Sequence, residues 1–571
     1  MCGILLQTGI KNNLKNFKNN LNKISHRGPD NISSISYQNI LIGHARLSII
    51  DLNKRSNQPM TSECGNYIIS YNGEIYNFKE LRLELINQGL NLKTNSDTEI
   101  LLNGYKVYGK NILNQLNGIF SFLIIDKIKN EIFFARDHFG VKPLYYLQNS
   151  NNFMISSETR VFENYTKKDE MTKILFLSHG YIPSPKTLYE DVLSLKPGHF
   201  GLFKNNKVET FQYYDLSKIF LTKSNGFKKK YLISAIKNQM ISDAKIGSFL
   251  SGGVDSSIIS SVISKNYKNL ETYSLRFEGA YDESIYQKKM IDKFQFNSKH
   301  QRINFNDFKK MIDEFISSMD QPTIDGFNTY FVSKLAKNNK VKVSFSGIGS
   351  DEIFYGYPVH KSIITKKLIK IIFKLFPNKL LPNRLKKIDY LKLKNDYGIY
   401  LSQRGIFSLE EISKFLSLDE SIIIDYLNSF VKDDLQKVSQ LNYTDKMGFF
   451  ELTKYMEGQL LRDADIFGMS NSIEIRVPFL DKNLVQNVLP VSNRKKTYSN
   501  INKILLVEKF KDILPKEIYS RGKKGFELPY NNWFSQFNLY EKLYKEDKKI
   551  KPFKNSHWSK LWALNIMKNK Y

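Results

Sequence analysis

The sequence predicts two domains: an α+β layered half, then an α/β half built on a parallel sheet with added helices. A chain of 571 residues is longer than one hydrophobic core usually organises. Short strand-like segments dominate as far as about residue 200, whereas buried strands alternate with helices from about residue 240.

The first half contains apolar and aromatic runs separated by Asn, Gly and Asp clusters. These runs predict strands within 67–77, 118–147 and 152–158. The segment "NFKELRLELINQG" predicts a helix that ends at Gly89 as its C-cap. An α+β layered domain with β-sheet at its centre fits this pattern.

The second half alternates buried strands with helices. Strands are expected at 245–250, 271–277 and 341–347, and helices at 256–267 and 282–294. Such alternation implies a parallel sheet covered on both faces. Helical patterns dominate after residue 395, including 445–474. We place the two domains at 2–200 and 225–571, with the transition between about 185 and 235.

Composition excludes several classes of protein. No run of about eighteen apolar residues is present, and the N-terminus lacks the pattern of a signal peptide. We therefore expect a cytoplasmic protein without membrane insertion. The two cysteines, Cys2 and Cys64, cannot build a disulfide framework and are expected to remain thiols.

The net charge of +29 raises the question of a nucleic-acid partner. The lysines are scattered, however, and only the stretch 366–394 is locally dense. We expect no nucleic-acid partner and interpret this stretch as solvated faces of short helices. Contact with a membrane surface or a partner protein is the alternative, because apolar and basic residues interleave there at helical spacing.

Cys2 stands directly behind the initiator methionine. If Met1 is removed, Cys2 presents a thiol and a free α-amine on one residue. That amine, with a usual pKa of about 7.7–8.0, can accept the thiol proton near neutral pH. Its position alone does not distinguish such a nucleophile from a cysteine that stands at the N-terminus without a catalytic role.

Six short motifs follow one another along the first half of the chain. They are "MCGI", "HRGPD" (26–30), "HARLSIIDL" (44–52), "YNGEIYN" (71–77), "TNSDTEILL" (94–102) and "RDHFGVKPLYY" (136–146). Together they resemble the class II glutamine amidotransferase half of asparagine synthetases. The resemblance implies a sandwich of the N-terminal-nucleophile type.

This resemblance gives each motif a role toward glutamine. Cys2 would attack the side-chain carboxamide and release ammonia, and the Asn72 amide and Gly73 N–H would stabilise the oxyanion. Arg46 would bind the α-carboxylate. Asp97 would hold the α-ammonium with Glu74 nearby.

The segment "SFLSGGVDSSIIS" (248–260) reads as a buried strand, a Gly-containing loop and a helix start. Glycines and a helix N-terminus allow backbone N–H groups to approach phosphate. GxxxxGK[ST] is absent, so this is not a Walker A loop. The form SGGxDS resembles the pyrophosphate loop of ATP pyrophosphatases, which implies an adenine-nucleotide-hydrolase-like fold. The predicted loop ligands of ATP are Ser251, Gly252, Gly253, Asp255 and Ser256.

Later motifs extend the resemblance to both halves. In "FSGIGSDEIFYGY" (345–357), Asp351 would hold Mg²⁺ against the pyrophosphate together with Asp255. Lys523 in "SRGKKGFELP" (520–529) would neutralise charge on the α-phosphate, and "LLRDADIFGMSNSIEIRVPFLD" (460–481) would lie near a channel between the sites. The predicted adenosine contacts are Leu250, Ser274 or Leu275, Ser346 and Gly347.

The resemblance implies a homodimeric, glutamine-hydrolysing asparagine synthetase. ATP would adenylate the aspartate side chain, and ammonia from glutamine would displace AMP. Ile348 departs from the family, where this position is often Asp or Glu. The same chemistry on another carboxylate, such as a sugar acid or a peptide, therefore stays open. An RNA-modifying enzyme is disfavoured because no CxxC is present, and a non-catalytic scaffold because the expected side chains are present.

Overall fold

The computed structural model describes residues 2–9, 13–149, 152–224, 226–278, 282–360, 382, 385–522 and 528–571. Of the sequence predictions, Lys523 and most of the basic stretch 366–394 lie outside these ranges. Within the ranges described, none of the helices combines the length and apolar character needed to cross a membrane.

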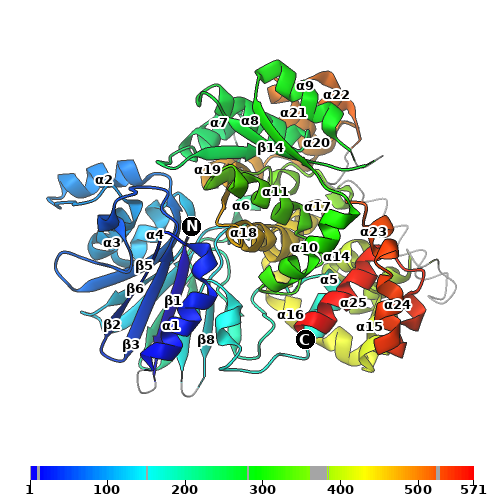
Figure 1. Cartoon of the computed structure of the whole chain (residues 1–571), viewed down its shortest axis with the longest axis horizontal. Coiled ribbons are helices and arrows are strands. Elements are labelled where there is room, and N and C mark those ends of the chain that lie inside the picture. The colour runs from blue at the N-terminus through cyan, green and yellow to red at the C-terminus, as the bar shows by residue number, and fades with distance from the viewer. Residues whose placement is uncertain are drawn as a thin grey trace.

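Two antiparallel six-stranded sheets form the first half (Figure 1). The first sheet has the order β10-β8-β9-β1-β3-β2 and the second the order β12-β11-β7-β6-β5-β4. The strands of the first sheet are β1 (Gly3–Thr8), β2 (Asn31–Tyr37), β3 (Ile40–Arg46), β8 (Tyr145–Gln148), β9 (Phe153–Ser156) and β10 (Val192–Ser194). Those of the second are β4 (Met60–Thr61), β5 (Tyr67–Ile75), β6 (Gly118–Asp126), β7 (Glu131–Arg136), β11 (His199–Lys204) and β12 (Lys207–Gln212).

The two sheets pack face to face. Alternate strand residues point to opposite faces, so Ile4 and Leu6 of β1 meet Leu123 and Ile125 of β6 in one apolar core. Helix α1 (Leu14–Lys23) covers the outer face of the first sheet, and α2 (Phe78–Asn87) and α3 (Asp97–Tyr108) cover that of the second. The layers helix, sheet, sheet and helix confirm the predicted α+β sandwich.

The strand and helix predictions for this half hold in detail. The run 67–77 contains β5, and 118–147 contains β6, β7 and most of β8. Helix α2 ends as expected, because Gly89 follows its last turn in the left-handed conformation with φ +83°. The shorter helices of this part of the chain are α4 (Ile112–Gln115), α5 (Thr172–His179) and α6 (Leu216–Phe220).

A five-stranded parallel sheet organises the second half. Its order is β15-β14-β13-β16-β17, so β13 (Ile246–Phe249) lies between β14 (Glu271–Arg276) and β16 (Val343–Phe345). The outer strands are β15 (Asn297–Arg302) and β17 (Glu474–Arg476). Because the strand order reverses at β13, the carboxyl end of this strand is where open α/β sheets bind ligands.

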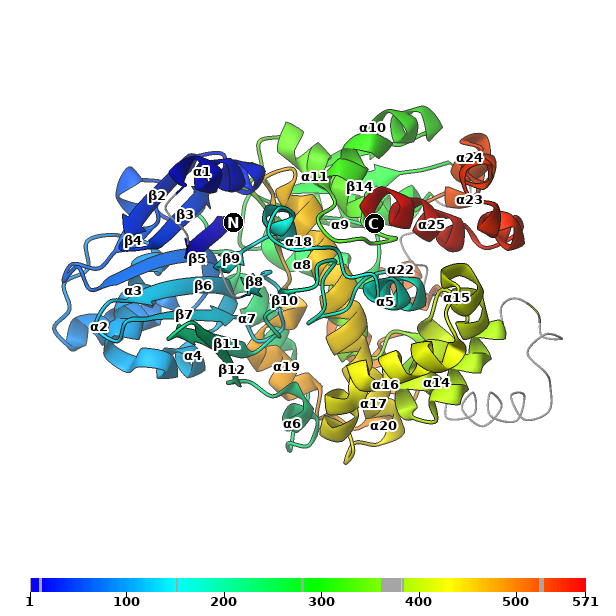
Figure 2. The same ribbon diagram turned by 90° about the horizontal axis from the view of Figure 1, so that it is seen from below.

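Helices complete the second half (Figure 2). Those connected with the sheet are α7 (Lys229–Asn238), α8 (Val254–Ser264), α9 (Ser284–Phe294), α10 (Phe305–Ser318), α11 (Phe327–Asn338) and α12 (Ser350–Ile353). The next group is α14 (Asp396–Arg404), α15 (Leu409–Leu416), α16 (Glu420–Lys437), α17 (Tyr443–Phe450) and α18 (Arg462–Met469). The last group is α19 (Lys482–Val488), α20 (Asn493–Thr497), α21 (Ile504–Phe510), α22 (Lys516–Ser520), α23 (Tyr530–Gln536), α24 (Leu539–Glu546) and α25 (Trp558–Lys570).

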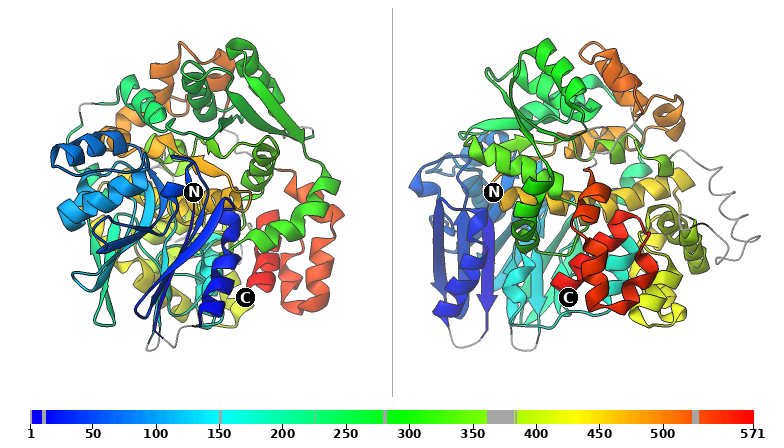
Figure 3. Two further views of the ribbon diagram at one scale, coloured as in Figure 1. Left: turned by 60° about the vertical axis from the view of Figure 1, so that its left-hand side comes forward. Right: turned by 45° about the vertical axis from the view of Figure 1, so that its right-hand side comes forward.

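A π-helical stretch, η9 (Glu451–Leu461), joins α17 to α18. The predicted helix 445–474 is therefore a continuous helical run with a wider middle as far as Met469, but its last residues are not helical, and Glu474 begins β17. The three views agree that this run lies beside the sandwich, and that the N-terminal end of the chain faces the junction between the halves (Figure 3).

Candidate active sites

A small cavity of ≈30 Å³ lies beside Cys2. Strands β1, β3 and β5 and the start of α3 bring to it five residues that the sequence predicts for one site. These are Cys2, Arg46, Gly73, Glu74 and Asp97. The sixth, Asn72, contacts the backbone of Cys2.

Cys2 is held in place through its backbone. Its N–H donates to Asn72 Oδ1 at 2.9 Å, and its carbonyl accepts from Arg27 Nε at 3.0 Å. The Asn72 Nδ2 group is buried and has no hydrogen-bond partner in the described part of the chain. This amide could therefore donate to an oxyanion formed beside Cys2. Burial raises the pKa of the Cys2 thiol, so a base is needed to generate the thiolate.

Gly73 is required by its backbone. Its φ of +151° lies in a region that side chains rarely adopt, and a Cβ here would come within 2.1 Å of the Ile119 carbonyl oxygen on β6. Glycine thus lets β5 approach β6 closely at a position that lines the cavity.

Arg46 is buried and rigidly held by oxygen acceptors. Nη1 donates to the Asn53 carbonyl at 3.0 Å and to Asn57 Oδ1 at 2.8 Å, and Nη2 donates to the Asp51 carbonyl. No carboxylate in the ranges described forms an ion pair with it. Its positive charge is therefore available to a carboxylate of a ligand.

The two carboxylates of this site are also buried. Asp97 Oδ2 accepts from the Tyr71 hydroxyl at 2.8 Å and from the Ile75 N–H at 3.1 Å, and burial raises the pKa of Asp97 to about 6. Burial, together with the neighbouring charge of Glu474, raises the pKa of Glu74 well above its usual range. Both groups would gain from the arrival of a cation.

A much larger pocket of ≈670 Å³ opens at the carboxyl ends of β13 and β16. Nine of the ten residues predicted to bind ATP line it; the exception is Gly252, whose carbonyl instead accepts from Arg521 Nη2 at 3.2 Å. The structure thus brings together the loops after β13, β14 and β16, which lie far apart in the sequence.

The first of these loops is preorganised at the N-terminus of α8. Ser256 Oγ accepts from the Ser251 N–H at 3.2 Å and lies 3.0 Å from Ser251 Oγ. The Ser274 hydroxyl donates to the Leu250 carbonyl at 2.7 Å, which joins this loop to β14. A loop held this way at a helix N-terminus suits phosphate groups.

Asp255 and Asp351 converge on one ammonium group that the sequence analysis missed. Lys503 Nζ donates to Asp255 Oδ2 and lies 3.1 Å from Asp351 Oδ1. Within the ranges described, no group of three or more His, Cys, Asp or Glu side chains is placed to hold a metal. The two carboxylates do converge on a cation, so they fit Mg²⁺ provided that phosphate oxygens complete its shell.

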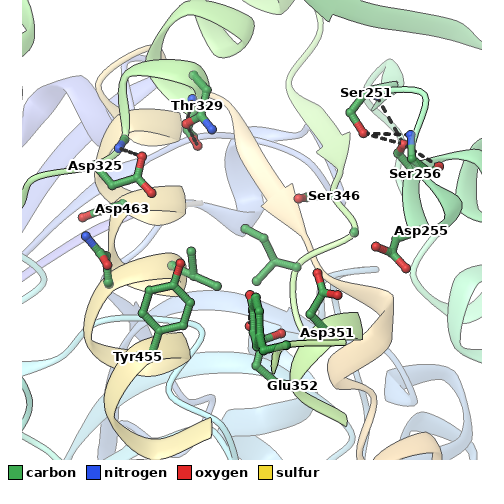
Figure 4. A pocket seen from close by; sticks show the side chains of 18 of the residues that line it. Ser251, Asp255, Ser256, Asp325, Thr329, Ser346, Asp351, Glu352, Tyr455 and Asp463 are labelled. Carbon is green, nitrogen blue, oxygen red and sulfur yellow. Dashed lines mark hydrogen bonds between the residues drawn. The ribbon is translucent and has the colours of Figure 1, made fainter. Parts of the chain in front are cut away.

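The opposite end of the pocket is acidic and aromatic (Figure 4). Asp325 and Asp463 lie together there, with Tyr455 of η9 below them, and the nucleotide loop is across the pocket. Burial raises the pKa of Asp463 to about 7. Arg404 pairs in two-pronged fashion with Glu451 and lies between the rings of Tyr357 and Tyr455, at 4.4 and 4.1 Å from their centroids.

Ile348 lines the same pocket. The carboxylate nearest to it in sequence that also lines the pocket is Asp351, followed by Glu352. Glu352 accepts from the Tyr357 hydroxyl at 2.8 Å, and burial beside Asp351 raises its pKa to about 7. No sequence signal had singled out Glu352 or the acidic end.

Buried ion pairs join the two halves between these sites. Arg27 is fully buried; its Nη1 donates to Glu158 of the sandwich at 3.0 Å and its Nη2 lies 2.8 Å from Asp465 of α18. Arg136 of β7 pairs with Glu457 of η9 at 2.8 Å. Because breaking such buried pairs is costly, the halves are fixed relative to one another at the junction.

Comparison with known proteins also divides the chain into two halves, each matched by its own family model. Residues 1–214 match the family model of a glutamine amidotransferase domain, and residues 229–564 match that of asparagine synthase. Glutamine-hydrolysing asparagine synthetase 1 of Bacillus subtilis is 31% identical over 536 residues, which cover 89% of this chain and 83% of the relative. Asparagine synthetase 3 of that organism is 27% identical, covering 92% and 87%. An amidase of Gibberella zeae is 26% identical, covering 93% and 87%.

Proposed function

The chain belongs to the family of glutamine-hydrolysing asparagine synthetases, and on that premise we propose that it transfers the amide nitrogen of glutamine to the side-chain carboxylate of aspartate at the expense of ATP. The general reaction, glutamine-dependent formation of a C–N bond, follows from the family. The acceptor and the roles of individual residues are our proposal. The observation that supports them best is the convergence of Cys2, Arg46, Asn72, Gly73, Glu74 and Asp97 on one cavity.

In the first half-reaction Cys2 attacks the glutamine carboxamide. The α-amine that removal of Met1 would expose serves as the base for the thiol. The Asn72 amide and the Gly73 N–H donate to the oxyanion, Arg46 binds the α-carboxylate, and Asp97 with Glu74 binds the α-ammonium. Collapse of the tetrahedral intermediate releases ammonia and leaves a thioester, which water then hydrolyses to glutamate.

In the second half-reaction the large pocket activates the acceptor. The loop Ser251–Ser256 binds the phosphates of ATP, and the walls at Leu250, Ser274, Leu275, Ser346 and Gly347 surround the adenosine. Mg²⁺, held by Asp255 and Asp351, would offset the negative charge of the pyrophosphate. The acceptor carboxylate attacks the α-phosphorus, pyrophosphate leaves, and ammonia then attacks the acyl carbon and displaces AMP.

One observation favours a second acceptor class. Ile348 lines the acceptor pocket at a position where an acidic residue is common in the family, and a hydrocarbon there can neither accept a proton nor orient ammonia by charge. A relative of similar length is named an amidase. A different carboxylate, such as a sugar acid or a peptide, is therefore the alternative to aspartate.

A product assay tests the proposal. The full-length protein is incubated with glutamine, ATP, Mg²⁺ and aspartate, and asparagine, AMP and pyrophosphate are measured by mass spectrometry, with aspartate omitted as the control. We expect asparagine and AMP in equal amounts. Cys2→Ala should abolish the glutamine-dependent reaction, and added ammonia should restore it.

The outcomes separate the two acceptor classes. Glutamate release without aspartate-dependent AMP would reject asparagine synthesis and leave an amidotransferase with another acceptor. Failure to release glutamate at all would reject the proposed role of Cys2.

A further inference from the structure

A residue from the second half of the chain contacts the wall of the proposed glutamine site. Arg476 lies on β17, the edge strand of the parallel sheet, and its side chain is fully buried. Its Nη2 group lies 3.4 Å from Glu74 Oε1, while Glu74 also lines the cavity beside Cys2. The synthetase half therefore reaches into the site where glutamine would bind.

Arg476 is fixed by contacts on its other nitrogens. Nε donates to Glu474 Oε1 at 2.6 Å, and Nη1 donates to the carbonyls of Gln239 and Ile241. Only Nη2 is left to face Glu74. The guanidinium therefore has one defined orientation, set by its own half of the chain, and Glu74 of the other half adapts to it.

Two carboxylates share this single guanidinium. Although burial alone would raise the pKa of Glu474, Arg476 lowers it to about 2, so Glu474 is the charged partner. Glu74 is left with the weaker contact, and its Oε2 atom has no hydrogen-bond partner in the described ranges. One further positive charge beside Glu74 would balance the group, and the α-ammonium of glutamine supplies it.

We propose that Arg476 is a positioning residue of the glutamine site: its guanidinium, anchored on Glu474, aims the carboxylate of Glu74 at the glutamine α-ammonium. This rests on the proposed function, in which Glu74 and Asp97 bind that ammonium. The glutaminase site is thus completed by the synthetase half.

The backbone of Arg476 provides an internal control. Its carbonyl accepts from the Ser346 N–H at 2.9 Å, and Ser346 lines the nucleotide pocket. A side-chain substitution leaves this hydrogen bond possible. Ammonia-dependent formation of AMP therefore reports whether the edge of the sheet is still folded, independently of glutamine.

The test compares variants of the full-length protein in two assays, glutaminase kinetics and ammonia-dependent AMP formation. For Arg476→Gln we expect KM for glutamine to rise about tenfold or more, with a smaller change in kcat and with ammonia-dependent AMP formation retained. Arg476→Lys, which keeps the charge, should recover part of the loss. Glu457→Gln is the matched control, because it breaks another buried Arg–Glu pair across the same junction and should leave KM for glutamine unchanged.

Glu474→Gln gives a result that general damage to the structure would not produce. It removes the charge that competes with Glu74 for Arg476, and it keeps a side-chain oxygen that can still accept from Nε and hold the guanidinium in place. KM for glutamine should therefore fall, and the acid limb of glutaminase activity should move to lower pH. The charged groups that face Glu74 are Asp97, Glu474, Arg476 and the N-terminal amine, and the hydroxyls of Tyr71 and Tyr76 also lie near it. Of these groups only Glu474 is altered.

A double-mutant cycle completes the test. If Arg476 acts through Glu74, then Glu74→Gln combined with Arg476→Gln should be scarcely worse than Glu74→Gln alone. Additive losses, or a wild-type KM in Arg476→Gln, would overturn the role of Arg476 while leaving the proposed function standing. A wild-type chain without glutaminase activity would overturn both. If Arg476→Gln does not fold, the KM values for glutamine of Arg476→Lys and Glu474→Gln test the role of Arg476 instead.

Discussion

At the scale of single residues, the proposed glutamine site contains two carboxylates, Glu74 and Asp97, whose pKa values burial raises. Asp97 accepts only neutral donors in the described structure, from Tyr71 and Ile75, and Glu474 adds repulsion. Its pKa of about 6 lies above the usual value for an aspartate. Only the ionised form can bind an α-ammonium.

This predicts a pH dependence for glutamine. The pKa of the folded enzyme is raised, so the binding form is present above about pH 6 and is lost as the pH falls through that value. We compare glutamine with an analogue that lacks the α-amino group, because any pH dependence of the Cys2 α-amine affects both substrates alike. The ratio of kcat/KM for glutamine to kcat/KM for the analogue should be about tenfold lower at pH 5 than at pH 7. Parallel profiles for the two substrates would contradict the role of Asp97.

Sequence motifs were sufficient for the residues whose chemistry is local. Cys2, Arg46, Asn72 and Asp97 each lie in a short motif, and all reach one site. Lys503 was missed because it reaches the pocket through contacts with distant segments, and no short pattern around it indicates those contacts. Glu352 and Arg476 stand inside the motifs 345–357 and 460–481, but the motifs alone do not indicate the burial of Glu352 or the contact between Arg476 and Glu74. Lys523 lies outside the described residues, so its role stays a prediction.

At the scale of elements, the carboxyl end of β13 and the start of α8 flank the loop that we propose to bind phosphate. Ser256 accepts from the Ser251 N–H and lies close to Ser251 Oγ, so its hydroxyl holds the loop open toward the pocket. The hydroxyl of Ser264, at the other end of the same helix, donates to the carbonyl of Ser261 at 3.1 Å. Substituting Ser256 therefore tests the geometry of the loop, whereas substituting Ser264 tests only the stability of the helix.

We expect Ser256→Ala to raise KM for ATP about tenfold, since one hydrogen bond to a charged group is worth roughly that factor. Glutaminase activity without ATP should be unchanged. Ser264→Ala, the matched control, should leave both unchanged. Release of pyrophosphate at varied ATP concentrations measures the effect, and equal KM values for the two variants would argue against this loop as the phosphate site.

Three of the five strands in the parallel sheet were predicted, whereas β15 and β17 were missed. The strand β15 has the sequence NSKHQR, which offers no buried apolar run, and β17 has only three residues. The π-helical geometry of η9 was also missed, because its apolar residues read as an ordinary helix. That stretch places Tyr455 and Gln459 in the pocket, as π-helical segments at functional sites often do.

At the scale of the whole molecule, the two candidate sites lie on either side of a junction closed by buried ion pairs. Arg27 contacts both halves: it binds Cys2 and Glu158 of the first half and Asp465 of the second. We expect so closely paired a junction to exclude water, which would protonate and dilute ammonia. The domain limits 2–200 and 225–571 stay a prediction; β11 and β12 of the second sandwich sheet extend to Gln212.

This predicts that ammonia passes internally. With amide-¹⁵N glutamine and an excess of unlabelled ammonium, we expect the amide product to carry mostly ¹⁵N. Mass spectrometry of the product measures the ratio, and Cys2→Ala, which can use only external ammonium, provides the unlabelled reference. A product labelled in proportion to the free ammonium would show that ammonia escapes to solvent before it reacts.

The contact between Glu74 and Arg476 also bears on how such enzymes can be rebuilt. Family models divide this chain cleanly into two modules, which suggests that the front half of one relative could be fused to the back half of another. The ion pairs at the junction argue otherwise, because each half supplies side chains that the other needs. In a chimera that takes residues 1–214 from one protein and the rest from another, Glu74 would face a β17 strand with which it does not normally pair. Engineers who recombine these modules should move Glu474 and Arg476 together with the front half.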